Sequence, residues 1–190
     1  MSRNLCLVGM MGAGKSTVAA LLGDRLGRRV ADSDEEIRVW TGRSIPDLFA
    51  EHGEAGFRDL ERQVVEGLAR FDDLVVSLGG GAVLRDDNVA ALLLSGVIIH
   101  LDVPVAVLAS RLRHGGADDR PLLGGPGGTE EELIERLRAT AAAREPRYRE
   151  VADVSIKASG PPEQVAEEII AWALAQGDVL TPSEHEQVMT

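Results

Sequence analysis

Cysteine is nearly absent from the sequence: Cys6 is the only one in 190 residues, so no disulfide can form within the chain. Aromatic residues make up 3%, too few for a platform on which nucleic-acid bases stack. No apolar run approaches the roughly 20 residues that cross a membrane. Basic residues number 20 against 31 acidic ones, and the net charge of −11 argues against nucleic acid or an anionic membrane as partner. We expect a cytoplasmic protein whose anionic ligands are small.

The remaining composition is that of a globular domain. A hydrophobic content of 44% in 190 residues is enough for one sizeable core. We expect a single domain over residues 1–176, followed by a polar, mobile tail over residues 177–190 that lacks apolar periodicity. A glycine-rich motif begins at Gly9, which leaves no room for a signal peptide.

That motif, Gly9–Thr17, carries the clearest functional signal. Its pattern G-x-x-x-x-G-K-S-T follows the apolar run Leu5–Val8 and opens an amphipathic segment, which is the context of a phosphate-binding P-loop. The glycines let backbone N–H groups surround a polyphosphate, and Lys15 adds a full positive charge. Ser16 offers a hydroxyl to a magnesium ion that bridges the phosphates. The alternative is a glycine turn that binds nothing, but strand, spacing and Lys15 together favour a nucleoside triphosphate site.

Strand-like and helix-like segments alternate along the chain. Extended or apolar runs predict strands over residues 5–8, 29–31, 74–78, 97–101 and 154–156. Caps and helical spacing predict helices over residues 15–26, 35–40, 88–94, 104–114, 129–145 and 162–175. They also predict a helix start at Ser44–Asp47 and, after it, a longer helix with apolar spacing over residues 57–68. This alternation predicts a parallel sheet with helices on both faces, and ligands of such sheets bind at the carboxyl ends of the strands.

Two acids, Asp32 and Asp34, follow the second predicted strand. In an extended segment both side chains point the same way. Asp32 could then hold the magnesium ion through water, while Asp34 accepts a proton from a hydroxyl that attacks the γ-phosphate. The alternative is a helix N-cap plus a solvated acid. We favour the functional interpretation, because a P-loop needs both a metal partner and a proton acceptor.

Four further features are candidates for ligand binding. Arg58 and Glu61 share one helix face, where they could serve a site or form a surface ion pair. The run Gly79–Gly81 follows a strand, and it makes sense where a ligand lies against bare backbone. Arg120, in a glycine-rich segment, is either a lid residue that closes over phosphates or a solvated loop arginine. Arg144, late in a helix, could also merely complement the helix dipole.

Taken together, these segments resemble the shikimate kinases over residues 5–175. The P-loop alone is shared by many unrelated proteins, whereas the blocks D-x-D, F-R-x-x-E, G-G-G, R-P-L-L and R-x-P-x-Y are specific in combination. In this sequence the matching blocks are Gly9–Thr17, Asp32–Asp34, Thr41–Ile45, Phe57–Glu61, Leu78–Ala82, Arg120–Leu123 and Arg144–Tyr148.

The resemblance implies an α/β fold: a three-layer, nucleoside-monophosphate-kinase-like P-loop NTPase with a five-stranded parallel sheet. It implies a substrate-binding region over about residues 34–61 and a lid over about residues 115–128. The implied reaction is transfer of phosphate from ATP to the 3-hydroxyl of shikimate, giving ADP and 3-phosphoshikimate for aromatic amino acid (chorismate) biosynthesis. One Mg²⁺ per subunit and a monomeric enzyme are implied as well.

The resemblance also implies individual roles. The catalytic residues would be Asp34, Lys15 and Arg120. ATP would contact Gly12, Ala13, Gly14, Lys15, Ser16, Thr17 and Arg120, with Arg113 and Ser159 as candidates near the adenine. Shikimate would be held or enclosed by Asp34, Arg58, Gly79, Gly80, Gly81, Arg144, Phe49, Phe57 and Glu61. The magnesium ion would be served by Ser16 and, through water, Asp32.

Two features depart from the family pattern. Extra glycine-rich residues lie between Leu123 and Arg144, and residues 156–160 lack the arginine that some relatives place near the adenine. Rival functions are another small-molecule kinase, such as gluconate kinase, which needs no paired arginines, and a nucleoside-monophosphate kinase, which needs a second phosphate site. A third is a non-catalytic nucleotide-binding regulator, but the presence of Lys15, Asp34 and Arg120 argues against it.

Overall fold

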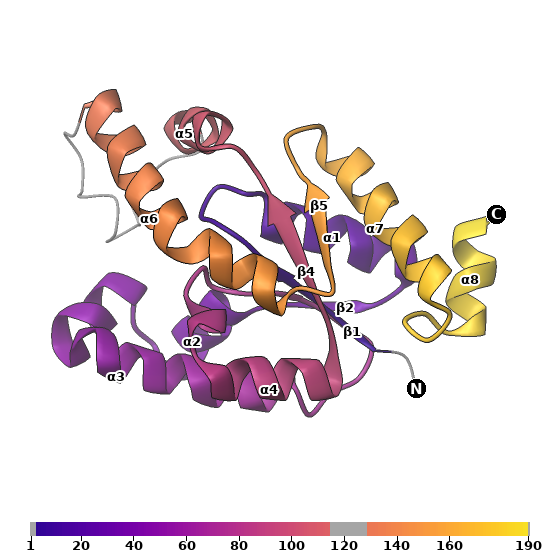
Figure 1. The fold of residues 1–190 in the computed structure, drawn as a ribbon. Coiled ribbons are helices and arrows are strands. Elements are labelled where there is room, and N and C mark those ends of the chain that lie inside the picture. Colours follow the sequence, from indigo (N-terminus) through magenta and orange to yellow (C-terminus); the bar gives the residue numbers. More distant parts are fainter. Residues whose placement is uncertain (1–2, 115–128, 190) are drawn as a thin grey trace.

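The sheet is at the centre of the molecule. The computed structural model describes residues 3–114 and 129–189, so the predicted lid and its Arg120 lie outside the described residues. Within that part of the chain, five parallel strands form one sheet in the order β2-β3-β1-β4-β5 (Figure 1). The strands are β1 (Asn4–Val8), β2 (Arg29–Asp32), β3 (Leu74–Ser77), β4 (Gly96–Asp102) and β5 (Val154–Lys157). The predicted five-stranded parallel sheet is confirmed.

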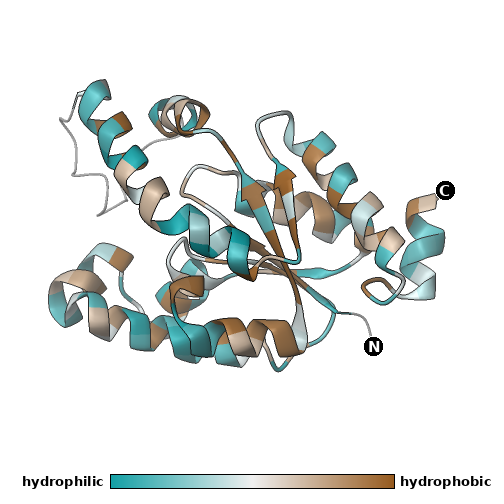
Figure 2. Ribbon diagram, in the orientation of Figure 1, coloured by the Kyte–Doolittle hydropathy of each residue, from teal (hydrophilic) through white to brown (hydrophobic). Residues whose placement is uncertain are grey.

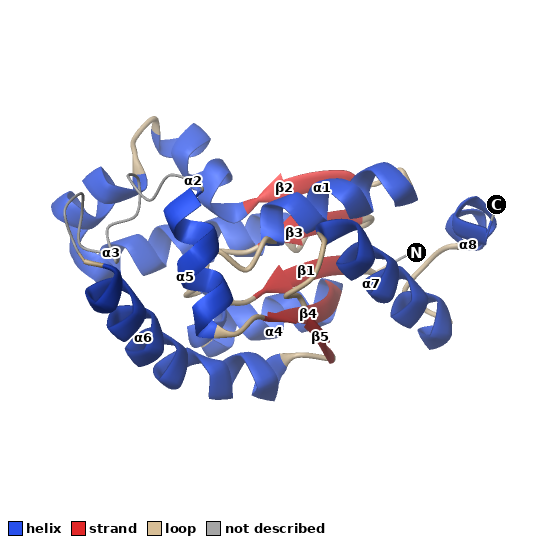
Figure 3. Ribbon diagram, turned by 90° about the horizontal axis from the view of Figure 1, so that it is seen from above, coloured by secondary structure: helices blue, strands red, loops and turns tan. Residues whose placement is uncertain are grey.

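Helices cover both faces of the sheet. On one face α1 and α7 pack against each other, and on the other α3 packs against α4 (Figure 3). The helices are α1 (Lys15–Leu26), α2 (Ser33–Thr41), α3 (Ile45–Leu68), α4 (Asp86–Ser95), α5 (Val105–His114), α6 (Glu130–Val151), α7 (Pro162–Gln176) and α8 (Pro182–Met189), with a short 3-10 helix η1 (Ala82–Leu84). No helix of the described ranges is long and apolar enough to cross a membrane.

The central strands are apolar because they are covered on both faces. Every residue of β1 is buried, and β4 is buried from Gly96 to Leu101. Figure 2 shows hydrophobic residues, coloured brown, along the strands of the sheet. The first strand lies between β3 and β4, in register with both. The P-loop that follows β1 is therefore placed at the middle of the carboxyl edge of the sheet.

Positive backbone angles in the P-loop explain its glycines. Gly12 and Gly14 have φ of 78° and 93°, values that side-chain-bearing residues rarely adopt. Gly9 has φ of 141°, and a Cβ built there would lie 2.8 Å from the carbonyl oxygen of Leu101. This loop can therefore wrap a ligand closely only with glycine at these positions.

The segment after β2 differs from the prediction in one respect. Asp32 ends the strand and caps α2, accepting hydrogen bonds from the backbone N–H groups of Asp34 and Glu35. Asp34 is thus in the first turn of a helix, and the expectation that it lies in an extended segment was wrong. An aspartate at the end of a strand competes well for the free N–H groups of a helix start, and α2 accordingly begins at Ser33, two residues earlier than predicted.

Helix α3 is broken at Gly53, whose φ of 66° and ψ of −177° are not helical. Its start is as predicted, since the Ser44 side chain accepts a hydrogen bond from the backbone N–H of Asp47. The preceding helix α2 carries Trp40, which is 56% exposed, whereas Trp172 on α7 packs partly against the main core. The break divides α3 into two helical pieces.

Helix α6 extends beyond the predicted end at Glu145. Its start has the predicted capping box of Thr129 and Glu132, but it runs through Pro146 to Val151. Proline removes one backbone hydrogen bond, a local cost that tertiary packing can outweigh. Here Leu137 and Tyr148, on either side of the proline, are completely buried in the main core.

The C-terminal tail was predicted to be mobile, and this prediction was wrong. Residues Pro182–Met189 form α8, which packs against α1, and the preceding Val179 and Leu180 are buried. Arg28 Nε donates to Glu184 Oε1 at 2.5 Å, and the two side chains are only 1% and 9% exposed. A polar sequence does not reveal such a contact, because the partner is 156 residues away.

Candidate active site

One cleft of about 740 Å³ brings most of the candidate residues together. It opens at the carboxyl ends of β1, β2 and β3, where the P-loop, the start of α2, part of α3 and the glycine run meet. Of the predicted site residues, it is lined by Gly12, Gly14, Lys15, Ser16, Thr17, Asp32, Asp34, Phe49, Phe57, Arg58, Glu61, Gly79, Gly80, Gly81 and Arg144. In the described part of the cleft, one end is formed by the P-loop, and we call it the nucleotide end. The other end is rich in charged side chains, and we call it the acceptor end.

The P-loop holds its lysine over the mouth of the loop. Lys15 Nζ donates to the carbonyl oxygens of Gly9 at 2.9 Å and Met10 at 3.1 Å. The Ala13 N–H also donates to the Met10 carbonyl, at 3.1 Å, so this turn is closed by its own backbone. Ala13 itself faces the core and is 2% exposed, so the backbone is the part of this residue available to a phosphate.

Ser16 and Asp32 form the pair predicted to serve a metal ion. Ser16 Oγ donates to Asp32 Oδ2 at 2.8 Å, and it lies 3.2 Å from Ser77 Oγ. The other carboxylate oxygen, Oδ1, caps α2. The helix-cap interpretation of Asp32 is therefore confirmed for Oδ1, and the role of Oδ2 toward a metal ion stays a prediction. The donor set is all oxygen, which fits Mg²⁺, an ion that takes few protein ligands beside phosphates and water.

No protein-only metal cage competes with this arrangement. Across residues 3–114 and 129–189, no group of three or more His, Cys, Asp or Glu side chains could hold a metal ion. A hydroxyl and one carboxylate beside a phosphate-binding loop are the usual protein contribution to a nucleotide-bound Mg²⁺.

Asp34 lies at the second end of the cleft beside a buried ion pair. A Cβ built on Gly79 would be 2.7 Å from Asp34 Oδ1 and 3.0 Å from Glu61 Oε1, so both carboxylates approach the bare backbone closely. Burial raises the pKa of Glu61, Arg58 opposes that shift, and the Asp34 charge adds to it. These groups are electrostatically coupled, which is common where chemistry takes place.

The pair Arg58–Glu61 is not a surface ion pair. Arg58 Nη1 donates to both oxygens of Glu61, at 3.0 Å and 2.9 Å, and the side chains are 12% and 1% exposed. Phe57 and Phe49 stack across the break in α3 with ring centroids 4.3 Å apart. The aromatic rings and the buried carboxylate together hold the guanidinium at the edge of the cleft.

The glycine run accommodates these side chains. A Cβ built on Gly81 would overlap with the Arg58 guanidinium, whereas one built on Gly80 would lie 3.4 Å from Arg144 Nη1. Arg144 Nη1 in turn donates to the Gly80 carbonyl at 3.2 Å. Two arginines from different helices thus approach one short stretch of backbone.

The close fit at Gly81 gives a testable prediction. We expect Gly81→Ala to displace Arg58 and to lower kcat/KM for the acceptor substrate by about 10- to 100-fold, because a misplacement of about 1 Å can have that effect. Steady-state kinetics with varied acceptor would measure this change. Gly67→Ala is the matched control, since a Cβ there meets nothing within 4 Å. Equal kinetics for the two variants would contradict the inferred role of the bare backbone.

Two predicted adenine contacts do not line the cleft. Arg113 is exposed, and Ser159 lies in the loop between β5 and α7. Their proposed contacts with the nucleotide stay predictions. Arg111 lines the cleft instead: its guanidinium donates to the Ala13 carbonyl at 3.2 Å and to the Ala158 carbonyl at 2.9 Å.

Sequence reasoning missed Arg111, although helix phase could have found it. Leu108 on α5 is buried, and Arg111 lies three residues after it, so the two are neighbours on the helix surface. Arg113 is one residue past Leu112 and turns toward solvent. Arg111, at the edge of the apolar face of α5, is therefore the residue that joins the P-loop to the β5–α7 loop.

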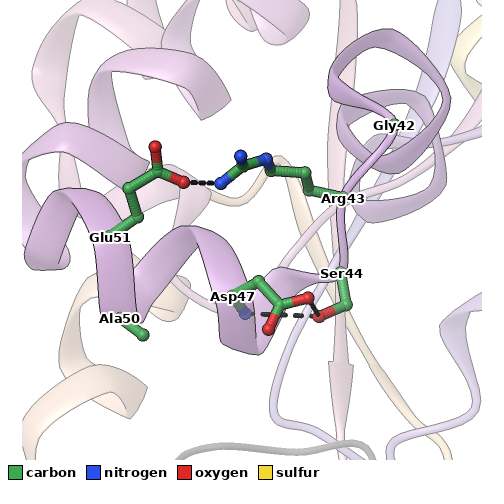
Figure 4. A pocket seen from close by; sticks show the side chains of 6 residues that line it. All are labelled: Gly42, Arg43, Ser44, Asp47, Ala50 and Glu51. Atoms are coloured by element: carbon green, nitrogen blue, oxygen red, sulfur yellow. Dashed lines mark hydrogen bonds and ion pairs between the residues drawn. The ribbon is translucent and has the colours of Figure 1, made fainter.

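A second, open pocket lies between the end of α2 and the first turns of α3, and it shares Ser44 with the cleft (Figure 4). Arg43 and Glu51 form an ion pair there, and Ser44 Oγ donates to Asp47 Oδ2 at 2.6 Å. These side chains are exposed and bind one another. Nothing in their arrangement is directed at a ligand.

Comparison with known proteins agrees with the geometry of the cleft. The family model for shikimate kinase matches residues 11–174. The shikimate kinase of Symbiobacterium thermophilum is 46% identical over 153 residues, which are 80% of this chain and 85% of that protein. The shikimate kinase of Synechococcus elongatus is 43% identical over 169 residues, 88% of this chain and 84% of that protein.

A solved structure gives the same result. The shikimate kinase from Acinetobacter baumannii, in complex with shikimate, superposes with a TM-score of 0.85 at 36% identity and covers 93% of this chain and 95% of that one. The matches therefore span nearly the whole P-loop domain, including both ends of the cleft. On this evidence the chain belongs to the shikimate kinase family.

Proposed function

We propose that this protein transfers the γ-phosphoryl group of ATP to the 3-hydroxyl of shikimate, giving ADP and 3-phosphoshikimate. The observation that carries the proposal is a single cleft with a P-loop at one end and, at the other, Arg58 and Arg144 beside Asp34. A kinase for a hydroxylated carboxylic acid needs these three elements. The product would enter aromatic amino acid biosynthesis through chorismate.

The nucleotide end supplies charge neutralisation. Backbone N–H groups of Gly12–Thr17 and the helix dipole of α1 would hold the phosphates, with Lys15 beside the transferred group. Arg111 would fix the loop against the adenine side, through its bond to the Ala13 carbonyl. Arg120 would close over the phosphates from the lid; its role is a prediction from the sequence.

Mg²⁺, when bound with ATP, would supply positive charge that offsets the charge developing on the phosphates. Ser16 and Asp32 would hold it, since their oxygens already lie 2.8 Å apart beside the P-loop. Asp32 would act through water, because its second oxygen is committed to the cap of α2.

The acceptor end supplies position and proton transfer. Arg58 and Arg144 would hold the carboxylate of shikimate, since guanidinium groups match a carboxylate with paired hydrogen bonds. Asp34 would accept the proton of the attacking hydroxyl. The backbone of Gly79–Gly81 would lie against the ring. Phe49, Phe57 and Glu61 would shape the pocket, Glu61 by holding Arg58.

The decisive test is an ADP-release assay with magnesium and ATP, comparing shikimate, gluconate and a panel of nucleoside monophosphates. Turnover with shikimate alone is expected, because two arginines face the acceptor end. Turnover with gluconate or a nucleoside monophosphate instead would overturn the assignment. Measurable ATP binding without any turnover would point to a regulator.

The carboxylate clamp can be tested at Arg58. We expect Arg58→Ala to raise KM for shikimate by about 10- to 100-fold, because a charge-assisted hydrogen bond is lost. The change also leaves Glu61 buried without its cation, so Arg58→Ala/Glu61→Gln is the control for that secondary effect. An unchanged KM in both variants would remove Arg58 from the clamp. Calorimetric titration with shikimate would measure the affinity directly.

The other expectations remain proposals. They are a single domain whose residues 34–61 bind the acceptor, a lid over residues 115–128, action as a monomer and a cytoplasmic location. Size-exclusion chromatography with light scattering would test the monomer.

A further inference from the structure

Tyr148 is the only tyrosine of the chain, and it is completely buried behind the acceptor end of the cleft. Its phenol donates a hydrogen bond to the Gly80 carbonyl at 2.5 Å. Arg144, one turn earlier on α6, donates to the same carbonyl at 3.2 Å. One backbone oxygen in the glycine run therefore accepts from two side chains of one helix.

The surroundings of Tyr148 fix its ring in this position. The His100 ring, from β4, lies 5.4 Å away and is itself completely buried. Burial raises the pKa of Tyr148, so the phenol keeps its proton near neutral pH and can only act as a donor to Gly80. Neither ring lines the cleft, so Tyr148 acts behind the substrate rather than on it.

Gly80 connects the two ends of the cleft. A Cβ built on it would lie 3.5 Å from the Gly9 carbonyl oxygen, which accepts the bond from Lys15 Nζ. The Gly9 carbonyl is held by Lys15 and not by Gly80, so we expect the loss of one donor on the Gly80 carbonyl to act at the acceptor end. Two donors on its carbonyl hold this peptide in place.

We propose that Tyr148 is a positioning residue that keeps the Gly80 carbonyl hydrogen-bonded when Arg144 turns to the substrate carboxylate. The proposal rests on the function assigned above, in which Arg144 engages that carboxylate. A carboxylate competes strongly for a guanidinium, so binding weakens the bond from Arg144 to Gly80. Without Tyr148, the half-buried Gly80 carbonyl would lose its last side-chain donor in the bound state, and the loss of such a hydrogen bond weakens that state.

The first test is Tyr148→Phe, which removes the hydroxyl and keeps the ring. We expect KM for shikimate to rise about tenfold, while kcat and KM for ATP change by less than about twofold. A purely structural role would instead lower the melting temperature and move both KM values together. Thr181→Val is the matched control: it removes a half-buried hydroxyl that is bonded to Glu184 and does not line the cleft, and it should leave KM unchanged.

The Arg144→Ala variant distinguishes the proposed role of Tyr148 from a general weakening of shikimate binding. In that background Gly80 depends on Tyr148 in both the free and the bound state, so adding Tyr148→Phe should no longer raise KM for shikimate. A tenfold rise that persists there, or no rise in the native background, would overturn the proposal. A wild-type enzyme that does not turn over shikimate would overturn the proposed function instead.

A second measurement needs no substitution at Tyr148. Because the chain has one tyrosine, 3-fluorotyrosine would give a single fluorine resonance. Saturating shikimate should shift this resonance in the native enzyme, since Arg144 leaves the shared carbonyl, and should shift it much less in Arg144→Ala. Equal shifts in both proteins would contradict the proposal.

Discussion

Replacing Asp34 by asparagine should lower kcat by about 10²- to 10⁴-fold, the usual contribution of a general base. The side chain lines the cleft opposite the P-loop, and asparagine keeps its size while losing the capacity to accept a proton. ATP affinity should change by less than about twofold, because the phosphate contacts lie in the P-loop. Steady-state kinetics and a nucleotide-binding titration would measure the two quantities.

Asp47→Asn is the matched control for this experiment. Asp47 also lies in the first turn of a helix, but it bonds Ser44 and is outside the cleft. Its kcat should remain near that of the wild type. If Asp34→Asn kept more than about a tenth of the wild-type kcat, Asp34 would not be the general base.

The second large effect is expected at the C-terminal helix. Glu184→Ala should reduce the free energy of unfolding by about 3–5 kcal/mol, because Arg28 is left buried without a counter-charge. Glu167→Ala is the control, since it breaks an exposed pair with Arg25 on the neighbouring helix and should cost less than about 1 kcal/mol. Urea unfolding would measure both. Similar values for the two variants would contradict a buried, stabilising pair.

The same pair predicts a dependence on pH. Burial opposes the charge of Glu184, but hydrogen bonds from Arg28 and from Thr181 outweigh it and lower its pKa below the ordinary value of 4.5. A lowered carboxyl pKa contributes stability that is complete above the ordinary value and is lost as the pH falls through the folded value. The stability difference between wild type and Glu184→Gln should therefore shrink only in acid. A difference that grows as the pH falls would contradict this sign.

Local patterns in the sequence were sufficient for the fold and for much of the site. The P-loop combines an apolar strand, fixed glycines and a helix start within residues 4–26, so each part supports the same prediction. Parallel strands then bring Asp32 and Gly79–Gly81 to the same edge without further information. The observed strand order β2-β3-β1-β4-β5 agrees with this placement at one edge of the sheet. The burial of the Arg58–Glu61 ion pair agrees with it as well.

What the sequence did not reveal depends on contacts between distant segments. Arg111 is recognisable only once α5 packs beside the P-loop, and Tyr148 only once α6 passes behind Gly80. Helix α8 has little apolar periodicity of its own, and its Glu184 pairs with Arg28, which lies between α1 and β2. The position of Asp34 in a helix followed from a capping competition that the aspartate pattern alone left open.

The two tryptophans make parts of this molecule separately visible by fluorescence. Trp40 on α2 is largely in water and shares a short helix with Asp34, whereas Trp172 on α7 packs partly against the main core. Emission from Trp40 should therefore report on α2, the helix that carries Asp34, and emission from Trp172 on the packing of the core. With Trp40→Phe and Trp172→Phe, each signal can be recorded alone, so acceptor binding and unfolding become distinct optical readouts of one chain.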